Sequence, residues 1–82
     1  MHFEQQDIGD YRIYTGATES RSGGYTAGVA VEQVRNVLHP PRRVYFNDHL
    51  SGGHLFATAE AALKFAMDVG QQAVRLEITN AI

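Results

Sequence analysis

The chain has 82 residues, of which 44% are hydrophobic, 10% aromatic and 20% charged, and its formal net charge at pH 7 is −2. A single domain of this size buries only about 60% of the surface that its unfolded chain exposes, so a second copy or a partner can add to a thin core. The chain has no cysteine, which excludes disulfide frameworks, thiol nucleophiles and cysteine-ligated zinc, and its charge excludes a global attraction to nucleic acid or anionic membranes.

The first residues, MHFEQQDIG, contain neither a basic region nor a long apolar run. They do not match a secretory signal, and no segment approaches the roughly 18 apolar residues that a bilayer-spanning helix needs. We therefore expect a cytoplasmic protein without a membrane partner. We expect residues 1–9 to form an N-terminal arm ahead of the folded part of a single domain.

Alternation of apolar and polar residues predicts three strands between residues 10 and 47. The strands are expected in DYRIYTGATES, in YTAGVAVEQVRNV and in RRVYFN. RSGG between the first two supplies turn residues and makes them a hairpin, and Pro40 and Pro41 separate the second from the third. The apolar register changes at Val34, which indicates a bulge, a bend or the end of the strand.

A loop over residues 48–57 leads to a helix predicted over residues 58–75, with a tail over 76–82. Thr58 is a good N-cap, and Glu60 and Lys64 stand in the favourable i, i+4 order. Gly70 leaves two alternatives open. Glycine favours a helix end, but inside a helix it also permits close packing, at a loss of about 1 kcal/mol in helix stability relative to alanine.

One face of this helix carries small residues that can lie flat on a sheet: Ala59, Ala62, Ala66, Gly70 and Ala73. Phe65, Met67 and Leu76 widen the apolar arc beyond the roughly 100° that one buried face requires. We expect these three residues to contact a partner, in the first place a second copy in a symmetric dimer. The alternative is that Phe3, Ile8 and the C-terminal RLEITNAI cover the flanks of the helix within one chain.

The sheet face opposite the helix is expected to be basic and aromatic. By alternation it presents Arg12, Tyr14, Thr26, Gly28, Arg43 and Tyr45. Arginines that contact phosphates and tyrosines that stack on bases would make it a possible nucleic-acid face, formed by Arg12, Tyr14, Arg43 and Tyr45. The alternative is a solvated surface on which arginine stems and tyrosine rings cover an exposed sheet.

The remaining candidate residues do not form a site with recognisable chemistry. His39, His49 and His54, with Asp48, surround the third strand, but their spacing is not that of a metal site and we expect solvent-exposed loop histidines. Ser51 beside them lacks the rigid support and oxyanion hole of a catalytic triad. We therefore predict no metal, no cofactor and no enzymatic activity. The two Ser-Gly-Gly stretches are expected to form turns.

From Tyr11 to Arg75 the order of elements is similar to small uncharacterised proteobacterial proteins of a β-β-β-α type, for which no activity is implied. RRVYFN followed by FATAEAALKFA also resembles the RVWLGTF and TAEEAAxAYD segments of the plant AP2/ERF-type DNA-binding domain. That resemblance implies a sheet whose face opposite the helix lies on DNA. The tryptophans of that domain are absent here and the net charge is acidic, so it bears on architecture more than on DNA binding.

Together these patterns predict an α+β fold in which a three-stranded antiparallel sheet carries one long amphipathic helix on one face. The expected function is a small non-enzymatic protein-interaction module that self-associates. The alternative is a nucleic-acid-binding domain that uses the face opposite the helix.

Overall fold

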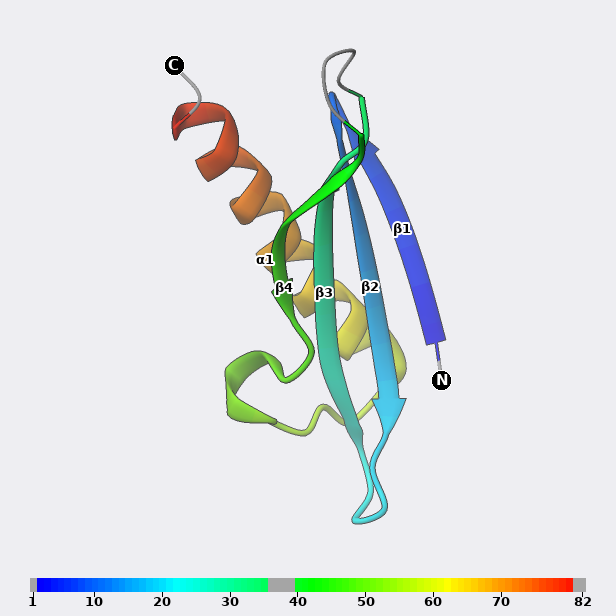
Figure 1. Ribbon diagram of the computed structural model, residues 1–82. Helices are drawn as coiled ribbons and strands as arrows, with labels where there is room; N and C mark the ends of the chain where they lie inside the picture. The colour runs from blue at the N-terminus through cyan, green and yellow to red at the C-terminus, as the bar shows by residue number, and fades with distance from the viewer. Residues whose placement is uncertain (1, 36–39, 81–82) are drawn as a thin grey trace.

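The computed structural model describes residues 2–35 and 40–80 and contains an antiparallel sheet with one helix on one of its faces (Figure 1). The elements are β1 (His2–Ile8), β2 (Tyr11–Glu19), β3 (Tyr25–Gln33), β4 (Arg42–Asn47), the 3₁₀ turn η1 (Leu50–Gly52) and α1 (Ala59–Asn80). The strands pair in chain order, so β1 and β4 are the edges of a four-stranded meander. The predicted α+β class is confirmed, but the sheet has four strands where three were expected.

The additional strand is β1, which takes the place of the predicted N-terminal arm. It pairs with β2 along its whole length, from His2 opposite Ala17 to Ile8 opposite Tyr11. The strand was missed because six of its seven residues are exposed and its sequence HFEQQDI lacks a clear apolar alternation. Gly9, with a φ of +56°, and Asp10 join β1 to β2 as a two-residue hairpin loop.

The hairpin of β2 and β3 is the centre of the sheet, and it was predicted correctly. The loop between the strands contains Gly23 and Gly24, both at positive φ, as expected of RSGG. The amide N–H and carbonyl oxygen of Tyr25 both bond to Phe56, at 2.8 Å each, so the segment before α1 is tied to the start of β3. The second strand ends at Gln33, next to the predicted break at Val34.

The third predicted strand, RRVYFN, is confirmed as β4, but its alternation is broken by a bulge. Val31 pairs with Tyr45 while its neighbour Glu32 pairs with Arg43, so Val44 is an additional residue on β4. A bulge shifts the following side chains to the other face of the sheet. Tyr45 therefore lies on the face covered by the helix and Phe46 on the opposite one, which corrects the predicted position of Tyr45.

The helix α1 begins as predicted, because the hydroxyl oxygen of Thr58 accepts a hydrogen bond from the amide of Ala61 at 3.1 Å. It ends later than either alternative, at Asn80, so residues 76–80 are helical instead of belonging to a tail. Gly70 lies inside the helix at a close approach to the sheet. A Cβ atom there would stand 2.5 Å from Cγ2 of Ile13 and 3.1 Å from Cγ2 of Val29.

The core lies between α1 and the two central strands, with small helix residues against branched strand residues. Ala62 and Ala66 on α1 and Ile13 and Val31 on the sheet are fully buried. We call this side of the sheet the inner face and the side away from α1 the outer face. No helix within the described part of the chain is both long and apolar enough to cross a membrane.

Candidate interaction surfaces

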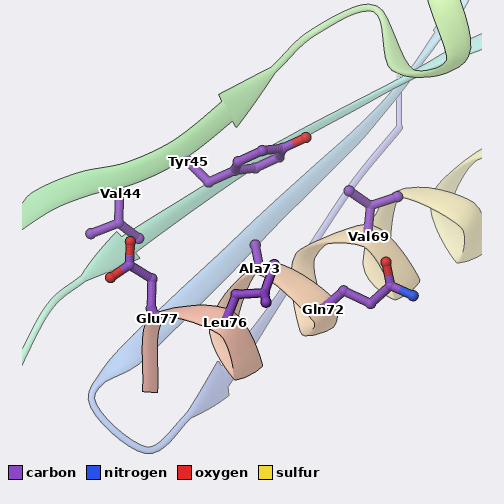
Figure 2. Close-up of a pocket in the computed structure, with 7 residues that line it drawn as sticks. All are labelled: Val44, Tyr45, Val69, Gln72, Ala73, Leu76 and Glu77. Carbon is purple, nitrogen blue, oxygen red and sulfur yellow. The ribbon is translucent and has the colours of Figure 1, made fainter. Parts of the chain in front are cut away.

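An apolar hollow of 240 Å³ lies between the C-terminal half of α1 and the edge strand β4 (Figure 2). We call it the α1–β4 groove. It is lined by Val44, Tyr45, Val69, Gln72, Ala73, Leu76 and Glu77. Figure 2 shows Val69, Ala73 and Leu76 along one side, on the helix, and Tyr45 and Val44 along the other.

The groove exists because α1 packs mainly on β2 and β3 and hardly touches β4. The bulge in β4 then turns Tyr45 toward the helix, where its ring forms one wall of the groove and stays half-buried. Leu76, on the other wall, is 63% exposed. A large aliphatic side chain on the rim of an apolar hollow indicates a surface that another molecule can cover.

The three residues predicted to contact a partner do not form one surface. Leu76 lies on the α1–β4 groove. Phe65 is half-buried, with its ring centroid 5.2 Å from that of Phe56. Met67 comes two residues after Phe65, which places it about 200° around the helix axis from Phe65. It therefore lies on the flank that faces β1. On the same flank, Gln71 donates a hydrogen bond to Gln6 of β1 at 3.1 Å.

The alternative of flanks covered within one chain is therefore correct in part, though with other residues. Ile8 packs against the core, as that alternative expected. Phe3 pairs opposite Gly16, on the outer face, and the C-terminal residues to Asn80 continue the helix. The residue that covers Phe65 is Phe56, which belongs to the segment tied to β3.

The outer face carries a row of four charged residues, one on each strand, with alternating sign. Their order across the sheet is Asp7, Arg12, Glu32 and Arg43. Arg12 donates to both carboxylate oxygens of Asp7, at 2.7 and 3.2 Å, and Nη2 of Arg43 lies 3.5 Å from Oε2 of Glu32. We call these residues the charge row.

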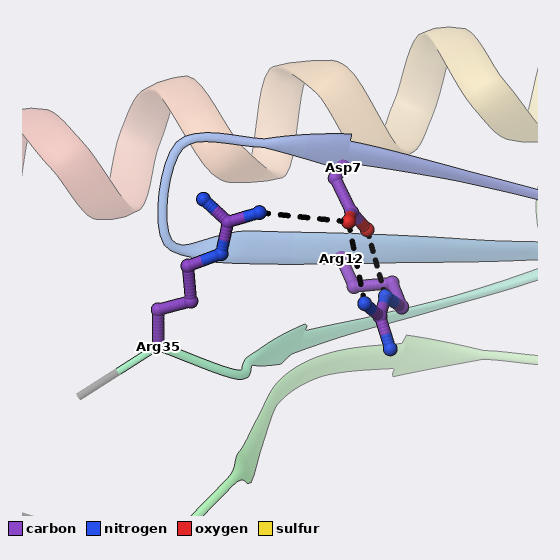
Figure 3. A network of polar contacts seen from close by, with 3 residues as sticks. All are labelled: Asp7, Arg12 and Arg35. Atoms are coloured by element: carbon purple, nitrogen blue, oxygen red, sulfur yellow. Dashed lines mark hydrogen bonds and ion pairs between the residues drawn. The ribbon is translucent and has the colours of Figure 1, made fainter. Parts of the chain in front are cut away.

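Asp7 is the most strongly paired carboxylate of this row (Figure 3). In addition to Arg12, Nη2 of Arg35 lies 3.9 Å from its Oδ2 atom. The hydrogen bond from Arg12 holds the pKa of Asp7 below its ordinary value, with smaller contributions from the charges of Arg12 and Arg35. The same hydrogen bond raises the pKa of Arg12, so this arginine is always charged.

The predicted nucleic-acid face is only partly assembled. Arg12, Tyr14 and Arg43 share the outer face as expected, whereas Tyr45 belongs to the α1–β4 groove. Phe46 takes its place on the outer face, and the guanidinium carbon of Arg43 lies 4.9 Å from the centroid of its ring. The sequence carried no direct sign of this exchange, because it depends on the bulge.

The loop histidines do not converge on a site. His49 and Asp48 form an exposed pair, with 2.9 Å between Nδ1 and Oδ1, and the hydrogen bond from His49 lowers the pKa of Asp48. His54 meets Phe56 edge to face, while His39 and the side chain of Ser51 lie outside the described residues. Within residues 2–35 and 40–80 no three histidine, aspartate or glutamate side chains could hold a metal ion together.

Comparison of the chain with protein-family models, with curated proteins and with solved structures gave no match.

Proposed function

We propose that the protein is a small non-enzymatic interaction module that self-associates through the α1–β4 groove. The observation that carries this proposal is the exposure of Leu76, 63%, beside a hollow whose walls are mainly Tyr45, Val69 and Ala73. Exposed apolar surface next to a hollow is typical of an interface that lacks its second half.

A second copy is the occupant that this geometry favours. Leu76 supplies a projecting side chain and the groove supplies a recess, so the same patch provides both parts of a self-complementary contact, as a two-fold interface requires. The helix has 22 residues and spans about 33 Å. Two helices packed flank to flank, across an axis perpendicular to the sheet, therefore offer the length that an interface of about 800 Å² per partner needs.

Analytical ultracentrifugation of wild type and of the Leu76→Glu variant tests the proposal. Burying a carboxylate in the interface should weaken self-association at least tenfold, or by about 1.4 kcal/mol, and halve the mass of the assembly at intermediate concentrations. Thr79→Glu is the matched control, because it adds the same charge in the same helical turn at an exposed position outside the groove.

The proposal fails if wild type stays monomeric up to about 1 mM, the concentration range of the weakest specific complexes. It also fails if Thr79→Glu disrupts assembly as strongly as Leu76→Glu, because the effect would then be one of net charge.

Nucleic-acid binding is the second candidate. One observation favours it: Arg43 stacks on Phe46, on the same face as Arg12 and Tyr14. This face would therefore present phosphate-binding arginines and base-stacking rings together. It is the weaker candidate because Asp7 and Glu32 already pair with the two arginines.

Fluorescence anisotropy of labelled single-stranded DNA, duplex DNA and RNA, each at two salt concentrations, tests this candidate. Saturable binding that falls steeply with salt, and that is lost in the Arg12→Ala, Arg43→Ala double variant, would support it. Absence of binding at low salt would eliminate it.

A further inference from the structure

The outer face has a second apolar hollow, of 160 Å³, which the α1–β4 groove does not involve. We call it the outer hollow. Its floor is formed by small residues of the two central strands, Gly16, Gly28 and Ala30, and its walls include Phe3 and Phe46 on the two edge strands. Phe3 is 73% and Phe46 54% exposed.

This arrangement differs from an ordinary solvated sheet face. A face in contact with water usually carries polar side chains along its centre, whereas here the centre is apolar and the rings that border it are left largely exposed. Ala30 is only 8% exposed although it lies on the outer face. An occupant must therefore present apolar surface to the centre and match the charge row at one end of the sheet.

The charge row selects the occupant. Its order of sign across the strands is minus, plus, minus, plus, from Asp7 to Arg43. An even alternating row becomes its own complement when its direction is reversed. We propose that the outer face binds a second copy of this chain, outer face to outer face, across a two-fold axis parallel to the strands.

That axis places β1 over β4 of the second copy and β2 over β3. Asp7 then faces Arg43 of the other copy and Arg12 faces Glu32, so all four positions meet an opposite charge. A two-fold axis across the strands would instead place β1 over β1. It would bring like charges together if it passed through the charge row, and at any other level it would carry the row away from its counterpart, so that no charges would pair. Charge complementarity of this kind fixes the orientation of an interface more than its affinity.

The same arrangement matches large side chains with small ones. Tyr14 pairs with Ala30 within one sheet, so in the stack Tyr14 of each copy lies over Ala30 of the other. Stacked sheets lie about 10 Å apart and interdigitate their side chains. Phe3 already leans over Gly16, 3.5 Å from the position of a Cβ atom there, and the stack would bury its exposed side.

This interface is independent of the α1–β4 groove, and a chain with both has two different two-fold contacts whose axes are perpendicular. The two axes do not meet, because one runs beneath the centre of the sheet and the other passes beside the helix flank at β4, so the two contacts together join chains into an open row and not into a closed ring. The expected mass of wild type therefore exceeds that of two 9.1 kDa chains and rises with protein concentration.

Light scattering of four proteins separates the two interfaces: wild type, Leu76→Glu, Phe46→Glu and the double variant. We expect an assembly larger than a dimer for wild type, a dimer for each single variant and a monomer for the double variant. If wild type is a dimer that only Leu76→Glu dissociates, the outer-face proposal is overturned and the α1–β4 proposal stands. If only Phe46→Glu dissociates it, the reverse holds, and a monomeric wild type overturns both.

Phe3→Glu is the second variant for the outer face, because Phe3 is the most exposed large apolar side chain among the described residues and lies on an edge strand, where a substitution perturbs the core least. It should act like Phe46→Glu, with Thr79→Glu again as the control. Circular dichroism must show the wild-type fold for each variant whose mass is interpreted.

The orientation has its own test in a variant with all four charges of the row inverted: Asp7→Arg, Arg12→Asp, Glu32→Arg and Arg43→Glu. Carried on the Leu76→Glu background, it should dimerise with itself but form few mixed dimers with the uninverted chain, as native mass spectrometry can measure. Mixed dimers in statistical proportion would overturn the proposed axis.

Discussion

The two faces of the central strands differ in how they are covered: the inner face packs against α1, while the outer face remains partly accessible. On β2, Ile13 and Thr15 point to the helix and are at most 2% exposed. Tyr14 and Gly16, which alternate with them, remain partly accessible on the outer face. Both faces have an apolar centre. Within residues 2–35 and 40–80, only the inner face has an element of its own chain to cover it, and this difference is the reason to look for a second copy on the outer one.

The largest expected effect compares the faces directly. Ile13→Ala removes a fully buried side chain and should lower the free energy of unfolding by about 3 kcal/mol. Phe46→Ala on the outer face should lower it by less than about 1 kcal/mol in dilute solution, where the chain is dissociated, and by more as the concentration rises.

Urea unfolding at several protein concentrations measures both effects. An equal loss for Ile13→Ala and Phe46→Ala in dilute solution would contradict the comparison, because the outer face would then be part of the monomer's own core.

A smaller effect is expected where the helix approaches the inner face most closely. Gly70→Ala places a methyl group 2.5 Å from Cγ2 of Ile13, and the resulting overpacking, typically about 1–3 kcal/mol, should outweigh the gain of about 1 kcal/mol in helix propensity. We expect a net loss of about 1 kcal/mol in thermal or urea unfolding.

Ala61→Gly is the control for Gly70→Ala, because Ala61 is exposed on the same helix and the substitution reports propensity alone. A Gly70→Ala variant more stable than wild type would show that the helix does not need glycine at this point.

The smallest effect concerns the charge row at low pH. Asp7 has a pKa below its ordinary value of 3.8 in the folded chain, so the unfolded chain binds its proton more readily. The stabilisation from Asp7 is therefore present above pH 4 or so, and is lost as the pH falls through the folded pKa.

Asp7→Asn should lower stability at pH 7 and flatten the fall of stability below about pH 4. Urea midpoints between pH 2 and pH 7 measure this. If the stability of Asp7→Asn falls below about pH 4 as steeply as that of wild type, Asp7 does not contribute to the loss of stability in acid. Asp68→Asn is the matched control, because it removes the same charge at an exposed position on α1, outside the charge row.

Much of the inner face could be predicted from local patterns. RRVYFN is a strand over the predicted residues, Thr58 caps the helix and the small residues of α1 meet the sheet. The strand β1 could have been found from Gly9 and Asp10, since a glycine followed by aspartate is a hairpin signal. Its polar sequence concealed it, because an edge strand needs no apolar alternation.

The candidate surfaces were less predictable. Phe65 and Met67 were expected on opposite flanks of the helix, where the structure has them, and Leu76 lies on an exposed apolar flank. The sequence left open which flank the chain itself covers, because an amphipathic pattern gives the width of an apolar arc and does not say which part of it a loop covers. Phe56 covers Phe65 only because its backbone bonds to Tyr25, more than thirty positions away.

The sequence by itself determined the elements whose signals are local: three of the strands, the turn at RSGG, the cap at Thr58 and the stripe of small residues on the helix. Only the tertiary structure decided the face on which Tyr45 and Phe46 lie, the role of Gly70 and the alternation of the charge row across the strands. Each of these depends on which residues stand opposite one another on different strands or on the helix and the sheet. Pairing register and close approach are properties of two segments at once, so no pattern within one segment can specify them.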